Sequence, residues 1–443
     1  MINMKRILTS FFILTIVTLL CAAQEQPQLG IVNRTQCTGF WRYDFNYQTT
    51  DSDGETPIVL SAAIFLSTKF HEKTDAAKGL ALMNHYTITN DAERPTNVTG
   101  QFSLEGFIQG SGFIIIESDG IGFGQTVDRQ QNYLKGRTTA RIDIDAFIAG
   151  RELLRQEGIG FGNLVANLGY SQGGHGGMWV NRLVAEGYRS DELPKIDYCI
   201  IGGGPYDMYS QLNGMFGEGV SYYPVAIPLI LNSIINDSDA LTYNDVFRPE
   251  FVEKIPEWFD SKKYKAAEIN NLIYQTFGGS AETGIQMSAI LTDEFINPES
   301  AAQKAAGEWL KENSLVYDDW SPIATDHIVF FHSHDDEVVP YVNMESMNQF
   351  LTNQGYTNYE IKDVSGKGHT DTGMYYAMQA KSLLTAFEPV GAVESIDAET
   401  SNDTPVDVYT IDGCLLMRQV SPRDAYNRLS RGVYIIGNKK VVK

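Results

Sequence analysis

The segment that most restricts the fold of this chain is Gly169-Tyr170-Ser171-Gln172-Gly173. Apolar residues typical of a buried strand (164–168) precede it, and a helical pattern (174–187) follows it. A serine between a strand and a helix needs a sharp turn with strained backbone, and side chains two residues before and after it would collide. Small residues are therefore required at both ends of the segment. Such a turn would lift the serine hydroxyl above the carboxyl edge of a sheet.

The rest of the chain alternates between short apolar runs and helical patterns, which indicates βαβ units and a mostly parallel sheet with helices on both faces. An opening hairpin is expected within 38–69. The predicted strands after it are 79–85, 112–117, 164–168, 195–201, 327–332 and 359–364. The predicted helices are 138–156, with Thr138 or Thr139 as its cap, then 174–187 and 372–387.

Composition and charge restrict the class of partner. The chain has 443 residues, of which 43% are apolar, so a large buried core is expected. Lys and Arg number 34 against 55 Asp and Glu, which gives a formal net charge of −21. Nucleic acids bind basic surfaces, so we expect no nucleic-acid partner. Only four cysteines are present, which excludes a disulfide-framework fold.

The first 23 residues have the pattern of an export signal. Lys5 and Arg6 precede an uncharged, mostly apolar run (7–21) and two alanines. That run is short for a bilayer span, and no other run is long enough, so we expect no permanent transmembrane segment. A retained anchor and a lipid-modified Cys21 are the alternatives. We therefore expect a periplasmic, cell-surface or extracellular protein.

Three further segments define the expected domains. Residues 24–388 form the main domain, and within it 206–322 interrupts the alternation with helical patterns rich in Met, Tyr and Pro. We interpret 206–322 as a helical insertion, either a lid over an acyl group or ordinary core. The polar, acidic stretch 389–405 is expected to be a linker. It leads to a small β-rich tail, so that 389–443 forms a separate region.

A serine hydroxyl is a weak nucleophile and needs a base that a carboxylate orients. In hydrolases whose serine lies on such a turn, the chain order is serine, acid, histidine. Asp336 follows the apolar strand 327–332 and should lie at the same sheet edge as Ser171. Asp335 is the alternative acid.

The base is expected to be His369, which follows the last predicted strand in the loop Ser365-Gly366-Lys367-Gly368-His369. A glycine-containing loop lets an imidazole reach across to the serine, and a neutral histidine suits a general base. His175 is the alternative. It lies one helical turn beyond Ser171 and otherwise should be a buried, hydrogen-bonded residue of the helix.

His332, His334 and Asp336 also match H-x-H-x-D, a metal-ligand spacing. A dinuclear hydrolase needs more ligands from several loops. Here Glu337 stands where such motifs often continue with histidine, and the chain has only seven histidines. We expect neither a metal nor a cofactor.

Two backbone N–H groups should stabilise an oxyanion. One belongs to Gln172, at the N-terminus of the helix after the serine. The other should come from the loop after strand 79–85, from Tyr86 or Thr87, with Thr89 as a neighbouring alternative. The His-Gly-Gly sequence of many lipases is absent, and Tyr86 stands at the place of the glycine.

The segments GYSQGGH, VNRLVAEGY and IIGGGPYD, within 169–207, resemble the secretory lipase family of α/β-hydrolases, typified by yeast lipase A. The resemblance covers about 60–387. It implies the α/β-hydrolase fold, a helical cap, carboxylic ester hydrolysis, and the roles of nucleophile, acid and base for Ser171, Asp336 and His369. The tail VDVYTIDG…GVYIIGNKKVVK is similar to C-terminal sorting domains of Bacteroidetes-type exported proteins.

Together these features predict an exported serine hydrolase acting on small-molecule or lipid esters. A serine peptidase of the same fold and a non-catalytic binding protein are the alternatives. The absence of β-propeller repeats weakens the peptidase hypothesis, and a complete Ser, Asp and His set argues against a pure binding protein.

Overall fold

The computed structural model describes residues 28–100, 103–238 and 240–387, and then 405–410, 415–421, 424–425, 428–429, 433–436 and 439–442. The expected signal segment 1–23 and nearly all of the expected linker 389–405 lie outside the described residues. The chain divides into two compact units, Met1–Thr385 and Ala386–Lys443.

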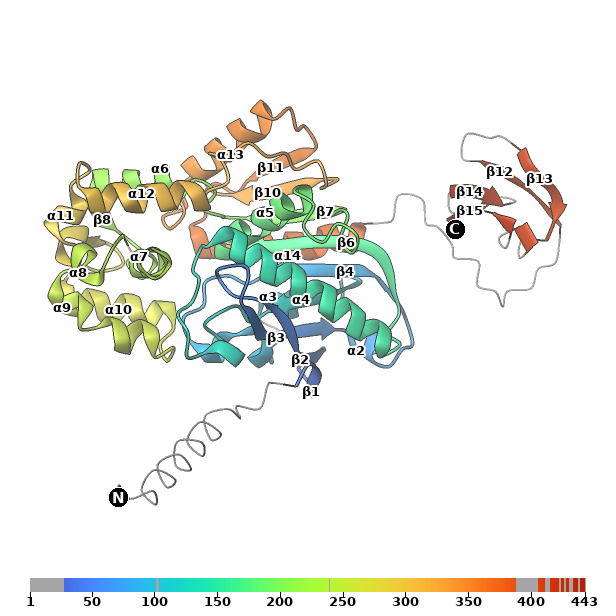
Figure 1. The fold of residues 1–443 in the computed structure, drawn as a ribbon, viewed down its shortest axis with the longest axis horizontal. Coiled ribbons are helices and arrows are strands. Elements are labelled where there is room, and N and C mark those ends of the chain that lie inside the picture. Colours follow the sequence, from blue (N-terminus) through green and yellow to red (C-terminus); the bar gives the residue numbers. More distant parts are fainter. Residues whose placement is uncertain are drawn as a thin grey trace, which may run out of the picture. The chain divides into compact units, whose positions relative to one another are not determined.

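A nine-stranded mixed sheet forms the centre of the first unit, with the order β1-β2-β3-β5-β4-β6-β7-β10-β11 (Figure 1). Its strands are β1 (Gly30–Gln36), β2 (Trp41–Thr50), β3 (Pro57–Leu66), β4 (Ala77–Asn84), β5 (Phe113–Ser118), β6 (Phe161–Tyr170), β7 (Tyr198–Gly202), β10 (Ile328–His332) and β11 (Tyr359–Asp363). The pairs β1–β2, β2–β3 and β3–β5 are antiparallel. All pairs from β5 to β11 are parallel, which confirms the expected mostly parallel sheet.

The expected hairpin is confirmed as β2–β3, whereas β1 was missed. Strand β1 lies at the edge of the sheet, and its residues are half-buried or exposed. Its sequence GIVNRTQ therefore shows neither an apolar run nor a strict alternation.

Helices cover both faces of the sheet, as expected. The α-helices of this unit that lie outside the segment 206–322 are α2 (Thr68–His71), α3 (Leu104–Ile108), α4 (Gly136–Gln156), α5 (Gln172–Ala185), α13 (Val342–Asn353) and α14 (His369–Ala386). A Cβ at Gly177 of α5 would meet Ile201, whereas a Cβ at Gly202 would meet Tyr376 of α14. Because successive strand residues point to opposite faces, α5 and α14 lie on opposite sides of β7.

The expected cap of the long helix α4 was wrong. Its N-cap is Lys135, and Thr138 and Thr139 lie inside the first turn. The Thr139 hydroxyl donates to the carbonyl oxygen of Lys135 instead of capping an N–H group.

The segment 206–322, which we call the cap, is largely helical and lies at the left in Figure 1. Its elements are α6 (Met208–Glu218), β8 (Val220–Ser221), α7 (Ala226–Asp237), α8 (Tyr243–Val246), α9 (Pro249–Val252), α10 (Ala266–Phe277), β9 (Ile285–Gln286), α11 (Asp293–Ile296) and α12 (Ala301–Asn313). A second hydrophobic core fills it, separate from the core around the sheet. Tyr133 and Leu134 are the members of this second core that come from outside the cap.

The second unit contains a small antiparallel sheet, which confirms the expected β-rich tail. Its strands are β12 (Val406–Thr410), β13 (Leu415–Val420), β14 (Val433–Ile436) and β15 (Lys439–Val442), in the order β13-β12-β14-β15. Val408, Ala425, Leu429 and Ile436 form its core.

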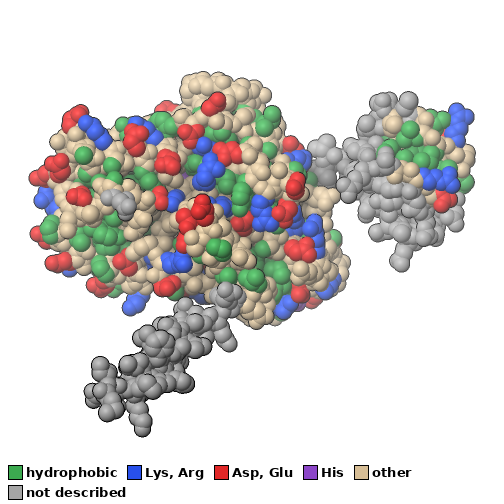
Figure 2. Space-filling view, viewed as in Figure 1, with side chains coloured by type: hydrophobic (Ala, Val, Ile, Leu, Met, Phe, Trp, Pro, Cys, Tyr) green, Lys and Arg blue, Asp and Glu red, His purple; other side chains and the backbone are tan. Residues whose placement is uncertain are grey.

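Acidic side chains are interspersed with basic ones on the face of the molecule drawn in Figure 2. Within the described ranges, no helix has both the length and the apolar composition that are needed to cross a bilayer.

The close approach of β4 to β6 at Gly79 provides a test of the sheet. A Cβ at Gly79 would lie 2.1 Å from the carbonyl oxygen of Leu164, so Gly79→Ala must push the two strands apart. We expect the free energy of unfolding, measured in urea, to fall by about 3 kcal/mol. The control is Gly214→Ala in α6, where nothing lies within 4 Å of a Cβ and alanine should stabilise the helix by about 1 kcal/mol. Equal stability of the two variants would contradict this packing.

Candidate active site

Ser171 occupies the turn between β6 and α5 in a conformation that L residues rarely adopt. Its backbone angles are φ 59° and ψ −121°, and it is the N-cap of α5. The Ser171 N–H donates to the carbonyl oxygen of Gly202, at 2.9 Å, so the end of β7 holds the turn in place. A strained conformation of this kind persists only where the surroundings impose it.

The glycines on either side of Ser171 leave no room for a side chain. A Cβ at Gly169 would lie 2.0 Å from the carbonyl oxygen of Gly173, as the collision argument predicted. At Gly173 the obstacle is different, because a Cβ there would lie 2.1 Å from the carbonyl oxygen of Asn84 at the end of β4. The loop after β4 thus lies directly against the first turn of α5.

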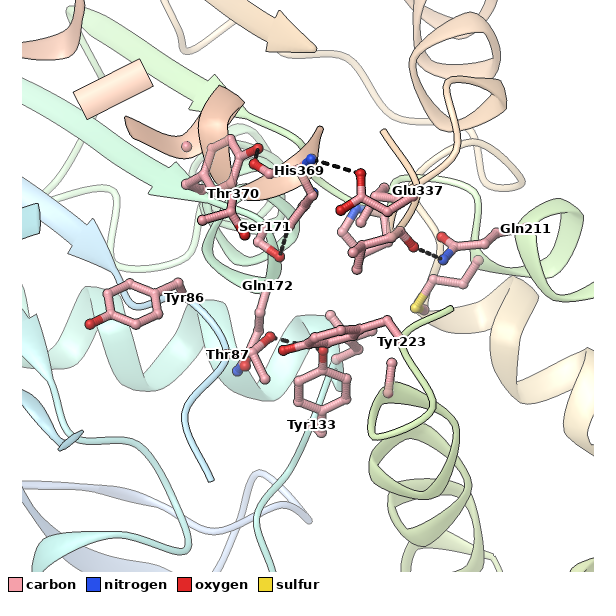
Figure 3. Close-up of a pocket in the computed structure, with 18 of the residues that line it drawn as sticks. Tyr86, Thr87, Tyr133, Ser171, Gln172, Gln211, Tyr223, Glu337, His369 and Thr370 are labelled. Atoms are coloured by element: carbon pink, nitrogen blue, oxygen red, sulfur yellow. Dashed lines mark hydrogen bonds between the residues drawn. The ribbon is translucent and has the colours of Figure 1, made fainter. Parts of the chain in front are cut away.

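Three side chains that are far apart in the sequence meet at this turn. The Ser171 hydroxyl oxygen lies 2.8 Å from His369 Nε2 (Figure 3), and His369 Nδ1 lies 2.7 Å from Asp336 Oδ2. A carboxylate only accepts hydrogen bonds, so Nδ1 carries the imidazole proton and Nε2 accepts from the hydroxyl. This arrangement can remove the hydroxyl proton while a nucleophile forms.

The Asp336 side chain is buried, with 5% exposure of the residue, and both of its oxygens accept hydrogen bonds. Its Oδ1 accepts from the backbone N–H groups of Val338 (3.0 Å) and Val339 (2.7 Å), and its Oδ2 accepts from His369. The alternative acid, Asp335, is exposed and accepts from the Gly366 N–H instead. Only Asp336 of the two contacts the imidazole.

The sequence predicted that His369 lies on a loop, but His369 is the first residue of α14. The helix begins three residues before the expected start. The backbone N–H of His369 donates to Glu337 Oε2 at 3.0 Å, and the carbonyl oxygen of His369 accepts from the Tyr170 hydroxyl at 2.6 Å. The imidazole is therefore carried by backbone that is fixed on both sides.

Tyr376 is a further supporting residue that sequence reasoning missed. Its hydroxyl accepts from the Gly169 N–H at 2.9 Å and donates to the carbonyl oxygen of Ile200 at 3.0 Å. Burial raises the pKa of this phenol, so it stays a hydrogen-bond donor. It ties α14 to β6 and β7. Tyrosine in an amphipathic helix is common, and no pattern in the sequence distinguishes this one.

The alternative base, His175, is buried, and its imidazole does not bond to the Ser171 hydroxyl; only its backbone N–H donates to the Ser171 carbonyl oxygen, at 3.2 Å. Its Nε2 donates to the carbonyl oxygen of Asn313 at 2.7 Å, and burial lowers its pKa to about 4. His175 is therefore a buried, hydrogen-bonded residue of the helix, which is the other role that the sequence predicted for it.

The two histidines of the H-x-H-x-D motif have separate partners. His332 donates from Nε2 to the carbonyl oxygen of Val339 at 2.9 Å, and its pKa is lowered by burial. His334 is exposed and stacks on the Tyr341 ring at 3.5 Å between centroids. Among the residues that the structure describes, no group of three or more His, Cys, Asp or Glu side chains is placed to hold a metal ion.

The predicted oxyanion residues lie beside Ser171. Gln172 is the first residue of α5, and the first N–H groups of a helix have no acceptor within it. Tyr86 and Thr87 line the same cavity as Ser171 and Gln172. In Figure 3 the Tyr86 ring extends away from Ser171, whereas the Thr87 hydroxyl bonds to that of Tyr133 at 3.0 Å. Thr89 does not line this cavity, and its side chain donates to the carbonyl oxygen of Tyr264.

Ser171 and His369 form part of the wall of a cavity of about 490 Å³. Most of its apolar lining residues come from the cap, from α3 and from α14. The apolar lining residues include Leu104, Phe107, Met208, Leu212, Met215, Ile230, Leu310, Met374 and Met378. A cavity with these walls suits an apolar group next to the Ser171 hydroxyl.

No protein-family model matches the chain, and no curated protein matches it. Solved structures do match. The esterase LipA of Xanthomonas oryzae, described as degrading rice cell walls, superposes with a TM-score of 0.62 at 18% identity, over 82% of this chain and 97% of LipA. The chain has the α/β-hydrolase fold.

Two further structures share this α/β-hydrolase fold. A protein of Legionella pneumophila, provisionally described as a hydrolase, gives a TM-score of 0.66 at 19% identity, over 81% of this chain and 91% of that protein. Candida antarctica lipase A gives a TM-score of 0.53 at 15% identity, over 81% of this chain and 83% of the lipase. The expected fold is thereby confirmed. The narrower assignment to the secretory lipase family stays a prediction, as does the sorting role of the tail.

The buried His175 makes stability depend on pH. Its folded pKa, about 4, lies below the unfolded value near 6.5, so the unfolded chain binds the extra proton as pH falls through this range. We expect His175 to remove about 2 kcal/mol of the free energy of unfolding between pH 7.5 and pH 5. In urea titrations His175→Gln should lose less stability than the wild type over this interval. Identical losses would contradict a buried, neutral His175.

Proposed function

We propose that this chain is an exported serine hydrolase that cleaves carboxylic esters through an acyl-enzyme intermediate. The observation that carries the proposal is the hydrogen-bond series from Asp336 through His369 to Ser171, placed in the wall of a largely apolar cavity. The esterases and lipases that share this fold favour ester substrates. Export rests on the expected signal segment 1–23.

In the first half of the reaction, Ser171 Oγ attacks the ester carbonyl carbon while His369 Nε2 takes the hydroxyl proton. The Asp336 carboxylate holds the imidazole by Nδ1 and stabilises its charged form. When the tetrahedral intermediate collapses, the C–O bond to the alcohol breaks. His369 gives its proton to the leaving oxygen, and the acyl group remains on Ser171.

The negative charge on the carbonyl oxygen is stabilised by backbone N–H groups. Gln172 supplies one at the positive end of α5, and Tyr86 or Thr87 supplies the second from the loop packed against that helix. Loss of one such donor typically costs about 3 kcal/mol in the transition state.

In the second half, water attacks the acyl-enzyme while His369 takes one of its protons. The proton then returns to Ser171 Oγ as the carboxylic acid leaves. The apolar walls favour an apolar acyl or alcohol group, because removing such a group from water stabilises the complex. The substrate class is thus a small-molecule or lipid ester, and no step requires a cofactor.

Replacing the nucleophile tests the proposal directly. We expect Ser171→Ala to lower kcat for p-nitrophenyl esters by at least about 10⁴-fold, since the covalent step is lost, with the circular dichroism spectrum unchanged. A fluorophosphonate probe should label the wild type at Ser171. A folded wild type that neither turns over esters nor takes the label would favour the non-catalytic binding protein.

The neighbouring aspartates form a matched pair. Asp336→Asn should lower kcat by about 10⁴-fold, because an amide cannot hold His369 in the required tautomer. Asp335→Asn removes the same charge one residue away, where the carboxylate binds the Gly366 N–H, and should change kcat by less than about tenfold. Equal effects of the two substitutions on p-nitrophenyl butyrate turnover would refute the role of Asp336.

A further inference from the structure

The walls of the active-site cavity carry an unbalanced charge. Within the described residues, Glu337 is the only Asp, Glu, Lys or Arg side chain that lines the cavity. The other polar lining residues are hydroxyls, amides and His369. Burial raises the pKa of the lining phenols, to about 12 for Tyr133, so they are uncharged at neutral pH. A substrate in this cavity therefore meets one carboxylate and no Lys or Arg side chain.

Glu337 is held beside the reacting groups. Its Oε2 accepts from the backbone N–H of His369 at 3.0 Å, at the N-terminus of α14 (Figure 3). A Cβ at Gly368 would lie 2.7 Å from the same oxygen, so the glycine lets the carboxylate approach the helix end.

Glu337 also lies where the cavity opens. Glu337 is exposed, as are three other lining residues, Thr370, Met374 (60%) and Met378 (50%). A group that enters or leaves past them comes close to the carboxylate. Solvent weakens the field there, so the charge should change relative rates by an order of magnitude rather than act as an absolute barrier.

We propose that Glu337 is a specificity-determining residue that makes the enzyme prefer uncharged and cationic esters over esters with an additional anionic group. This inference rests on the proposed ester hydrolysis and names its substrate class more narrowly. An ester with a free carboxylate, phosphate or sulfate finds no Lys or Arg side chain in the walls and is repelled by Glu337. The carboxylate product is repelled in the same way, which speeds its departure.

The test compares three p-nitrophenyl esters with acyl chains of equal length. They are the neutral hexanoate, the adipate monoester with a terminal carboxylate, and the 6-(trimethylammonio)hexanoate. Apolar walls disfavour both charged esters, so the informative quantity is the ratio of kcat/KM for the cationic ester to that for the anionic one. We expect this ratio to be well above one for the full wild-type chain.

Glu337→Gln removes the charge and keeps an oxygen that can accept from the His369 N–H. We expect the ratio to fall about tenfold, and inhibition by hexanoate to become stronger. Glu337→Ala, assayed in parallel, removes the same charge without the amide and should give the same ratio. Glu345→Gln is the control, because it removes one exposed carboxylate that does not line the cavity, and it should leave the ratio unchanged.

Three results would overturn the inference. They are a wild type that hydrolyses the anionic ester as well as the cationic one, Glu337 variants whose ratio stays within twofold of the wild type, and a Glu345→Gln variant that shifts the ratio equally. Failure of the proposed function is distinguishable, since the wild type would then hydrolyse none of the three esters, including the neutral one.

Discussion

The structure depends on one strained residue at a strand-to-helix turn. Ser171 keeps a positive φ because the Gly202 carbonyl oxygen holds its N–H, and because glycines at 169 and 173 allow β6, α5 and the end of β4 to touch. The same contacts place the hydroxyl at the sheet edge and put the N-terminus of α5 beside the loop after β4. The strain at Ser171, the position of this proposed nucleophile and the predicted oxyanion donors therefore have a common origin in backbone packing.

The partners of Ser171 reach it because parallel strands end at one edge of the sheet. Asp336 follows β10 and His369 follows β11, so both lie at the edge of the sheet where β6 also ends. Two buried tyrosines then hold the elements that carry Ser171 and His369 together. The Tyr170 hydroxyl of β6 donates to the carbonyl oxygen of His369, and the Tyr376 hydroxyl of α14 accepts from the N–H of Gly169. Two hydrogen bonds therefore link β6 to α14.

Much of this could be predicted from the sequence, and the failures have physical reasons. Buried strands such as β5 and β10 have continuous apolar runs, and the turn at Ser171 has a sterically required glycine pattern, so both were located. Edge strand β1 lacks such a run. The start of α14 was missed because the N-terminal N–H of His369 is bonded by Glu337, 32 residues away in the sequence, and local patterns cannot show such a partner. The roles of Tyr170 and Tyr376 depend on the same kind of distant contact.

The cap has a hydrophobic core of its own, joined from outside by Tyr133 and Leu134. One wall of the cavity therefore rests on packing that is largely independent of the sheet carrying Ser171, Asp336 and His369. During evolution, substitutions in α6, α7 and α12 can reshape this wall while the sheet keeps Ser171, Asp336 and His369 in place. Divergence among relatives should accordingly concentrate in the cap, while the residues around the serine turn change slowly.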